Sequence, residues 1–80
     1  AVLMAKRFKS AISCCYCGQN FNEFITKSID HIVPLALNGS NEVDNLCICC
    51  LQCNLSKRDL SFKKWIDLCR LVVQTYDSKH

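Results

Sequence analysis

Cys14-Cys15-Tyr16-Cys17 and Cys50-Leu51-Gln52-Cys53 are two Cys-x-x-Cys pairs, and this spacing lets both thiolates of a pair reach one metal ion. Four thiolates at about 2.3 Å in a tetrahedron complete the coordination shell of Zn²⁺ and leave no open position. Residues 18–49, 32 in all, separate the pairs. This gap exceeds the roughly 15–20 residues of a common zinc site, so a whole structural element is expected inside the zinc loop. The cysteines predict a structural zinc ion held by Cys14, Cys17, Cys50 and Cys53.

The length and composition explain why so small a chain needs a disulfide or a bound metal to stabilise its fold. The chain has 80 residues, of which 8 are Cys. A domain of this length buries only about 60% of the surface that its unfolded chain exposes, so its hydrophobic core is marginal without a disulfide or a metal. Hydrophobic residues make up 50% of the chain and charged residues 21%, which excludes disordered and low-complexity classes. We expect a single domain over residues 1–80.

The cysteine pairs are expected to bind metal rather than to form disulfides, because the sequence lacks the marks of secretion. The N-terminal apolar run Ala1–Ala5 is interrupted by Lys6 and Arg7 and is no signal-peptide core. No apolar run approaches the ~20 residues of a membrane span. We therefore expect a cytoplasmic protein with no membrane partner, and in a reducing compartment cysteine pairs hold metals.

The region between the cysteine pairs contains two candidate strands. Residues 24–33 are rich in β-branched side chains and predict a strand that ends at Pro34, because proline cannot donate to a ladder. Residues 34–45 contain Asn-Gly-Ser-Asn and predict a compact loop. Residues 46–49 predict a second, short apolar strand, and residues 50–58 predict a short helix because they contain no helix breaker.

Helices are predicted on both sides of this region. Residues 2–12 place apolar side chains at rough helical spacing, beside a basic cluster. The C-terminal helix begins after Ser61, a credible N-cap, and carries a long apolar stripe that predicts a core face with Cys69 as a buried thiol. The basic cluster consists of Lys6, Arg7 and Lys9, and the stripe of Phe62, Trp65, Ile66, Cys69, Val72, Val73 and Tyr76.

A resemblance to a known family is carried by four segments in order: Asp30-His31-Ile32-Val33-Pro34-Leu35, Asn38-Gly39-Ser40-Asn41, Asp44-Asn45-Leu46 and Cys50-x-x-Cys53-Asn54-x-x-Lys57. With Cys14-x-x-Cys17 they resemble the HNH endonuclease family, in its zinc-stapled branch. The resemblance covers residues 14 to about 65, the expected core 14–65 of the domain. It implies an α+β fold, a small zinc-stapled ββα-metal finger flanked by an N-terminal helix and a C-terminal amphipathic helix. Three further thiols lie outside the family pattern and leave open which thiols hold the zinc: Cys15, Cys47 and Cys49.

The resemblance implies hydrolysis of DNA phosphodiester bonds with one divalent cation. A hard cation takes oxygen ligands, and the Asp30 carboxylate and the Asn54 amide oxygen would supply two. Mg²⁺ or Mn²⁺ is expected, with Ni²⁺ and Zn²⁺ as further candidates, and the ion would stabilise the departing 3′ oxygen. Imidazole, with an ordinary pKa of about 6.5, suits a general base, and in the family this role falls to the strand histidine, here His31. Since adjacent strand residues face opposite ways, a bulge or the strand's end at Pro34 has to re-aim Asp30 or His31.

Further roles follow from the same resemblance. Asn45 is expected to pin the loop that orients His31, Lys57 to contact a substrate phosphate, and Arg58 to join it. The expected partner is double-stranded DNA. One ββα site cuts one strand, so the protein is expected to act as a monomer or a homodimer. A small free-standing protein of this kind looks most like phage or bacterial defence machinery, which implies a bacterial or phage-encoded protein.

Three other classes of protein fit the sequence less well than a nuclease. A catalytically silent zinc module that binds nucleic acid or protein has no need for Asp30, His31 and Asn54 together, and all three are present. A secreted disulfide domain is disfavoured by the absent signal. A zinc nucleobase deaminase requires His-x-Glu, whereas His31 is followed by Ile32 and Val33.

Overall fold

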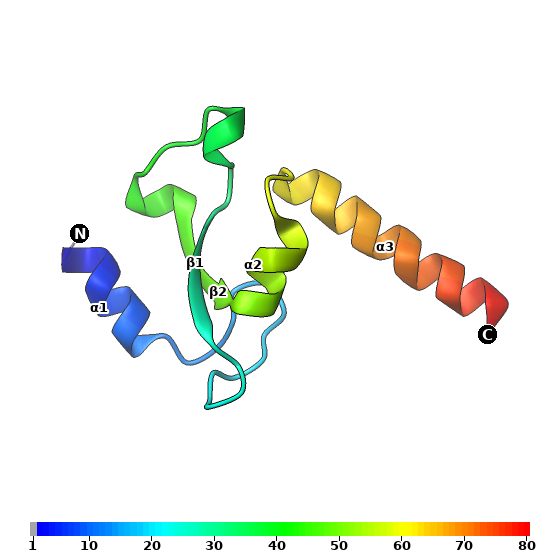
Figure 1. The fold of residues 1–80 in the computed structure, drawn as a ribbon, viewed down its shortest axis with the longest axis horizontal. Coiled ribbons are helices and arrows are strands. Elements are labelled where there is room, and N and C mark those ends of the chain that lie inside the picture. Colours follow the sequence, from blue (N-terminus) through cyan, green and yellow to red (C-terminus); the bar gives the residue numbers. More distant parts are fainter. Residues whose placement is uncertain (1) are drawn as a thin grey trace.

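The computed structural model describes residues 2–80, and Figure 1 shows a small sheet between two helices, with a longer helix that extends away from it. The elements are α1 (Val2–Ser10), β1 (Lys27–His31), β2 (Leu46–Cys50), α2 (Leu51–Lys57), α3 (Phe62–Lys79) and two short 3-10 helices, η1 (Leu35–Leu37) and η2 (Val43–Asn45). The predicted α+β class is confirmed. Ala1, which belongs to the expected 1–80 domain and to the N-terminal apolar run, lies outside the described residues.

The sheet consists of β1 and β2 in antiparallel order. Lys27 lies opposite Cys50, and the pairing continues without interruption to His31 opposite Leu46. The first strand is therefore shorter than the predicted 24–33. The physical reason is that β2 passes directly into α2 after Cys50, so the residues before Lys27 have no partner strand.

The two faces of the sheet carry different chemistry, because successive side chains alternate. Ser28 and Asp30 face α2, which donates to them from Asn54 and Lys57. Ile29, together with Leu46 from the partner strand, borders a hollow that α1 completes. The polar face thus points at α2 and the apolar face at α1.

The buried centre of the molecule is made mainly of thiols. Cys14, Cys49 and Cys50 form the buried cluster. Around them pack partly buried side chains from the first cysteine pair, the following loop and the sheet: Tyr16, Phe21, Ile25, Cys47 and Cys53. A core with so few aliphatic side chains gains little from hydrophobic burial, since that gain grows with the apolar area removed from water.

The N-terminal helix is held to the sheet by one lysine. Lys27 Nζ donates to the carbonyl oxygens of Phe8 at 2.6 Å and Lys9 at 3.2 Å. These carbonyls belong to the last turn of α1, where a cation satisfies unpaired acceptors and the helix dipole. The helix ends at Ser10, two residues before the end of the predicted span 2–12.

The C-terminal helix begins where predicted, but its apolar stripe is not a core face. Ser61 Oγ accepts a hydrogen bond from Lys64 N at 3.2 Å, as expected of an N-cap. Trp65 is buried, whereas Cys69 is only half-buried and Tyr76 is 62% exposed. The prediction of a buried stripe is wrong because α3 leaves the body of the molecule after its first turns (Figure 1). Within residues 2–80, none of the helices has both the length and the hydropathy needed to cross a membrane.

Candidate active site and cysteine cluster

The four predicted cysteines come together. The Sγ atoms of Cys14, Cys17, Cys50 and Cys53 all lie within 4.8 Å of one another. The first pair sits in a tight turn that closes with Gly18 N donating to Cys14 O at 3.0 Å, and Gly18 has a positive φ of 77°, a conformation that glycine adopts without steric cost. This all-thiolate set is suited to a structural zinc ion.

Backbone amides prepare these sulfurs to act as ligands. Cys14 Sγ accepts hydrogen bonds from Tyr16 N at 3.3 Å and Cys17 N at 3.4 Å. Burial raises the pKa of Cys14, but the backbone hydrogen bonds outweigh it and bring this pKa down to about 6. In the second pair, Cys50 Sγ accepts from Cys53 N at 3.3 Å and thereby caps α2. Burial raises the pKa of Cys53, so it is at Cys14 that the fold favours a thiolate before any ion binds.

The remaining thiols near the sheet do not join this cluster. Among residues 2–80, the set of four is the only group of three or more cysteine, histidine or acidic side chains close enough to share an ion. Cys47 and Cys49 alternate with Ile48 along β2, opposite Asp30 and Ser28. The geometry thus favours the four thiols with Cys-x-x-Cys spacing as the ligands of a structural metal ion.

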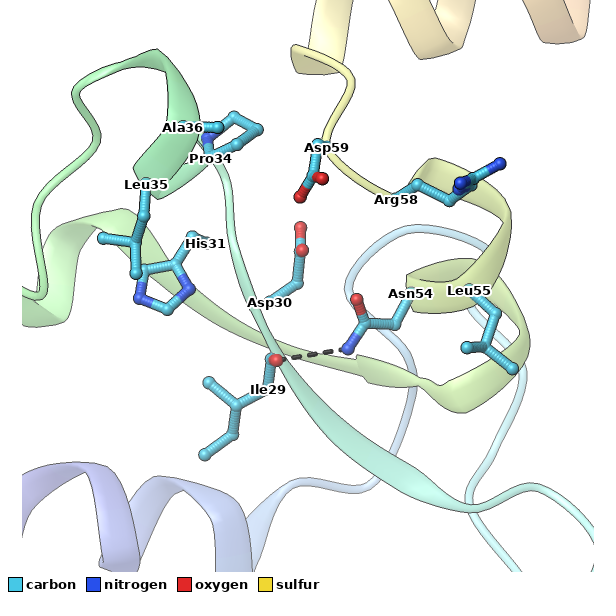
Figure 2. Close-up of a pocket in the computed structure, with 10 residues that line it drawn as sticks. All are labelled: Ile29, Asp30, His31, Pro34, Leu35, Ala36, Asn54, Leu55, Arg58 and Asp59. Carbon is cyan, nitrogen blue, oxygen red and sulfur yellow. Dashed lines mark hydrogen bonds between the residues drawn. The ribbon is translucent and has the colours of Figure 1, made fainter.

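A cleft of about 410 Å³ lies beside β1, between η1 and the end of α2 (Figure 2). Asp30, His31 and Asn54 line it, as do Arg58 and Asp59. Three predicted catalytic and metal-binding side chains, which lie up to 24 residues apart in the chain, thus meet at one hollow.

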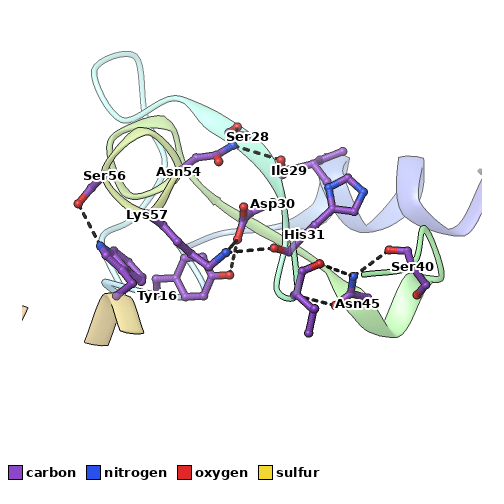
Figure 3. Close-up of polar contacts among 12 residues, drawn as sticks. Tyr16, Ser28, Ile29, Asp30, His31, Ser40, Asn45, Asn54, Ser56 and Lys57 are labelled. Carbon is purple, nitrogen blue, oxygen red and sulfur yellow. Dashed lines mark hydrogen bonds and ion pairs between the residues drawn. The ribbon is translucent and has the colours of Figure 1, made fainter. Parts of the chain in front are cut away.

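Asp30 is held through only one of its oxygens. It is 6% exposed, and Oδ2 accepts a hydrogen bond from Tyr16 Oη at 2.6 Å and lies 3.0 Å from Lys57 Nζ (Figure 3). Both contacts use the same oxygen, so Oδ1 is left for a ligand in the cleft.

Lys57 lies in a different place from the one that the resemblance implies. Its side chain is 0% exposed, and Nζ contacts Asp30 Oδ2 at 3.0 Å and donates to His31 O at 3.1 Å. An ammonium group enclosed in this way does not reach a phosphate in the cleft. The expected phosphate contact of Lys57 does not fit this arrangement, and its observed role is to neutralise the buried carboxylate. Arg58, in contrast, is exposed and lines the cleft, where a phosphate contact stays a prediction.

Asn54 presents its amide oxygen to the same space. Its Nδ2 donates to Ile29 O at 3.2 Å and to Ser28 Oγ. These bonds orient the amide, and Figure 2 shows its oxygen on the side of Asp30. One carboxylate oxygen and one amide oxygen on the same side of a cleft fit a hard divalent cation, which prefers oxygen donors.

His31 reaches the cleft from the other side of β1. Figure 2 shows Asp30 and His31 leaving the ribbon in opposite directions, and the unbroken register excludes the expected bulge. Both side chains still line the cleft, because β1 ends at His31 and, among the described residues, has only β2 as a neighbour. His31 Nε2 lies 2.8 Å from Asn41 Oδ1. Since an amide oxygen only accepts, Nε2 is the donor in this contact, and Nδ1 is the ring nitrogen that carries the lone pair when the imidazole is neutral.

The loop that carries Asn41 is tied together by Asn45. Asn45 Oδ1 accepts from Val33 N at 2.9 Å, and Nδ2 donates to Val33 O at 3.0 Å and Ser40 O at 2.8 Å. At Gly39 an added Cβ would lie 1.8 Å from Val33 O, so only glycine lets the chain close this tightly. These bonds link the two ends of the loop next to the imidazole.

Three residues at the site were not found from the sequence. Tyr16 is enclosed by the first cysteine pair, and its position between two ligands was the available signal. Asn41 lies in the quoted Asn-Gly-Ser-Asn segment, whose polar side chains gave a weaker signal. Asp59 faces Asp30 across the cleft (Figure 2), and the chain turns it there through Arg58, which has a φ of 54°. No sequence pattern near Arg58 predicts that turn.

Comparisons with known proteins agree with this geometry. A sequence model described as HNH endonuclease matches residues 14–69. The chain is 41% identical over 58 residues to the CRISPR-associated endonuclease Cas9 of Actinomyces naeslundii, covering 71% of this chain and 5% of that protein. It is 43% identical over 53 residues to the CRISPR-associated endonuclease Cas9 of Corynebacterium diphtheriae, covering 65% of this chain and 5% of that protein. The chain therefore spans about 5% of the length of these relatives. No solved structure matches significantly.

Proposed function

Because the chain belongs to the HNH endonuclease family, we propose that it is a metal-dependent endonuclease that hydrolyses DNA phosphodiester bonds. The observation that carries this proposal is the meeting of Asp30, His31 and Asn54 at one cleft. Two oxygen donors and a base with a free lone pair at the same hollow are what hydrolysis of a phosphodiester with a divalent cation requires.

Asp30 and Asn54 hold the cation in this proposal. Asp30 Oδ1 is the carboxylate oxygen that its neighbours leave free, and Asn54 contributes its amide oxygen. Mg²⁺ or Mn²⁺ bound by these oxygens and by water would neutralise the charge that builds on the phosphate and stabilise the departing 3′ oxygen. The remaining charge of Asp30 is balanced from behind by Lys57.

His31 is the general base. Its Nδ1 takes the proton from the attacking water, while Asn41 Oδ1 accepts from Nε2 and keeps the ring in the tautomer that this step needs. Asn45 acts through the loop, because its bonds to Val33 and Ser40 keep Asn41 beside the ring.

The proposed substrate is double-stranded DNA. The chain carries a net charge of +3, and Arg58 at the cleft and Lys64 at the start of α3 are exposed, so both can neutralise phosphates of a bound strand. Since one cleft cuts one strand, a double-strand break requires a homodimer or two encounters. The chain spans only about 5% of its Cas9 relatives, so the proposal takes from them nuclease chemistry alone.

Replacing His31 with Ala tests this function. In a plasmid-nicking assay with Mg²⁺ or Mn²⁺, the rate is expected to fall by about 10²–10⁴-fold, the usual contribution of a general base. Zinc content, the thermal transition and DNA binding should not change. His80→Ala, which alters the other histidine in an exposed position, is the matched control and should nick at the wild-type rate. Equal activity of His31→Ala and wild type would remove the catalytic role. Zinc-loaded wild type that binds DNA without nicking it would identify a silent binding module.

A further inference from the structure

Tyr16 touches both the cysteine cluster and the cleft. Its backbone N–H donates to Cys14 Sγ at 3.3 Å, and its hydroxyl donates to Asp30 Oδ2 at 2.6 Å. One residue thus links a sulfur of the cysteine cluster to the carboxylate that lines the cleft, and Figure 3 shows the contact of its hydroxyl with Asp30.

The ring of Tyr16 is fixed by the start of α3. It stacks on Phe62 with 5.5 Å between ring centroids and meets Trp65 edge-on at 5.1 Å. Trp65 is itself held by a hydrogen bond from Nε1 to Ser56 Oγ at 3.1 Å. Backbone on one side and aromatic packing on the other leave the hydroxyl little freedom to move away from Asp30.

The hydroxyl of Tyr16 is the donor in its contact with Asp30. A carboxylate oxygen only accepts, so the phenol O–H points at Oδ2 across 2.6 Å. A bond from a neutral donor to a carboxylate is short and strong, and it fixes the direction in which this oxygen faces.

We propose that Tyr16 is a positioning residue that, by occupying Asp30 Oδ2, directs Oδ1 to the divalent cation in the cleft. The inference rests on the proposed function, because it assumes that a cation binds there. Lys57 contacts the same oxygen from α2, so Tyr16 and Lys57 approach Oδ2 from two separate elements and stop the carboxylate from rotating. The backbone of Tyr16 also donates to Cys14 Sγ. The turn that carries the first cysteine pair therefore sets the position of the Asp30 carboxylate in the cleft.

A purely structural role for Tyr16 makes a different prediction. If the ring only filled space between α3 and the turn of the first cysteine pair, Tyr16→Phe would keep the stacking with Phe62 and Trp65 and would not alter cation binding. If the hydroxyl orients Asp30, the same variant should bind the cation more weakly, because partners that orient metal-ligating groups are typically worth about 10–100-fold in metal affinity or activity.

The experiment uses the full zinc-loaded chain and Mn²⁺ as the probe. Electron paramagnetic resonance of free Mn²⁺ gives the dissociation constant for wild type, Tyr16→Phe, and the control Tyr76→Phe, whose ring is exposed on α3. Tyr16→Phe is expected to weaken Mn²⁺ binding about 10-fold or more, with unchanged zinc content. Tyr76→Phe should match wild type. Unchanged Mn²⁺ affinity in Tyr16→Phe would overturn the proposal.

A second measurement distinguishes weaker cation binding from partial unfolding of the variant. In the nicking assay, Tyr16→Phe should need about 10-fold or more Mg²⁺ for half-maximal rate and approach the wild-type rate at saturating Mg²⁺. Loss of folded protein alone would lower the maximal rate and leave the Mg²⁺ requirement unchanged, which would contradict the inference. Wild type that binds no Mn²⁺ would refute the proposed cation site, and the role of Tyr16 with it. Wild type that binds Mn²⁺ and nicks, beside a variant with unchanged affinity, would refute the role of Tyr16 alone.

Discussion

Lys57 carries its charge where water does not reach. Its Nζ has two partners, Asp30 Oδ2 at 3.0 Å and His31 O at 3.1 Å, and its side chain is 0% exposed. A buried ion pair repays the loss of hydration only with good geometry and further hydrogen bonds, and here Tyr16 supplies one of those bonds. Loss of the lysine would leave a nearly buried carboxylate without a counter-ion.

Lys57→Met should lower the free energy of unfolding of the zinc-bound protein by about 3–5 kcal/mol in buffer without other divalent cations, the cost of breaking a buried pair from one side. Added Mn²⁺ should restore part of this loss, because a cation at Asp30 Oδ1 neutralises the stranded charge. Denaturant unfolding with and without Mn²⁺ measures both effects. Lys63→Met, at an exposed lysine paired with Asp67, should change stability little and show no Mn²⁺ response. Equal effects of the two substitutions would contradict the structural role of Lys57.

Most of the surface of α3 is exposed. It has 18 residues, and Trp65 near its N-terminal end is its buried side chain. Most of the stability of a helix in a protein comes from the packing of its apolar face rather than from helix propensity. The first turns pack on Tyr16, so stability should decrease along the helix toward its C-terminal end.

Hydrogen exchange tests this gradient. Backbone amides of residues 70–79 should exchange much faster than those of β2 and α2, because local opening of an unpacked helix requires little free energy. Exchange measured by mass spectrometry or NMR at two protein concentrations gives the comparison. Protection of residues 70–79 equal to that of β2 would show that another surface covers the helix in solution, and its dependence on concentration would identify self-association.

The molecule as a whole is thin and extended for its length, with dimensions of 48 × 33 × 15 Å. Its buried centre is the thiol cluster around Cys14, Cys49 and Cys50 rather than an aliphatic core. The four clustered cysteines bring the turn of the first pair next to the start of α2, although 32 residues separate the two pairs in the chain. A metal ion at this point would contribute folding free energy directly, as it does in other small metal-bound domains.

Removal of zinc by a strong chelator should therefore abolish the cooperative thermal transition. Zinc affinity should also weaken from about pH 8 to about pH 6, because protons compete for the thiolates. The pKa of Cys14 is lowered from 9.0 to about 6, so its thiolate stabilises the fold fully above pH 9 and loses this contribution as the pH falls through 6. A chromophoric chelator measures zinc release across this range. Cys50→Ser should lose zinc and the transition, whereas Cys15→Ser, outside the cluster, should keep both. Zinc affinity independent of pH would contradict the assignment.

Local chemistry explains which parts of the fold and the site were predictable. The order of two strands and a short helix, the Cys-x-x-Cys spacing of each pair and the cap at Ser61 follow from residue patterns within a few positions of one another. The prediction that the apolar stripe on α3 is buried was wrong, because periodicity shows that a helix has an apolar face and does not show what covers it. The strand over residues 24–33 was predicted too long, because the length of a strand depends on where its partner turns away.

The sequence by itself determined the α+β class, the two Cys-x-x-Cys pairs and the residue types that could hold a cation and act as a base, since ligand spacing and side-chain chemistry are local properties. Only the tertiary structure decided that Lys57 is buried against Asp30, that Tyr16 holds the same carboxylate, and that Asp59 faces the cleft. These facts depend on distances between segments that are far apart in the chain and on the exclusion of water between them. No spacing within one segment encodes either quantity.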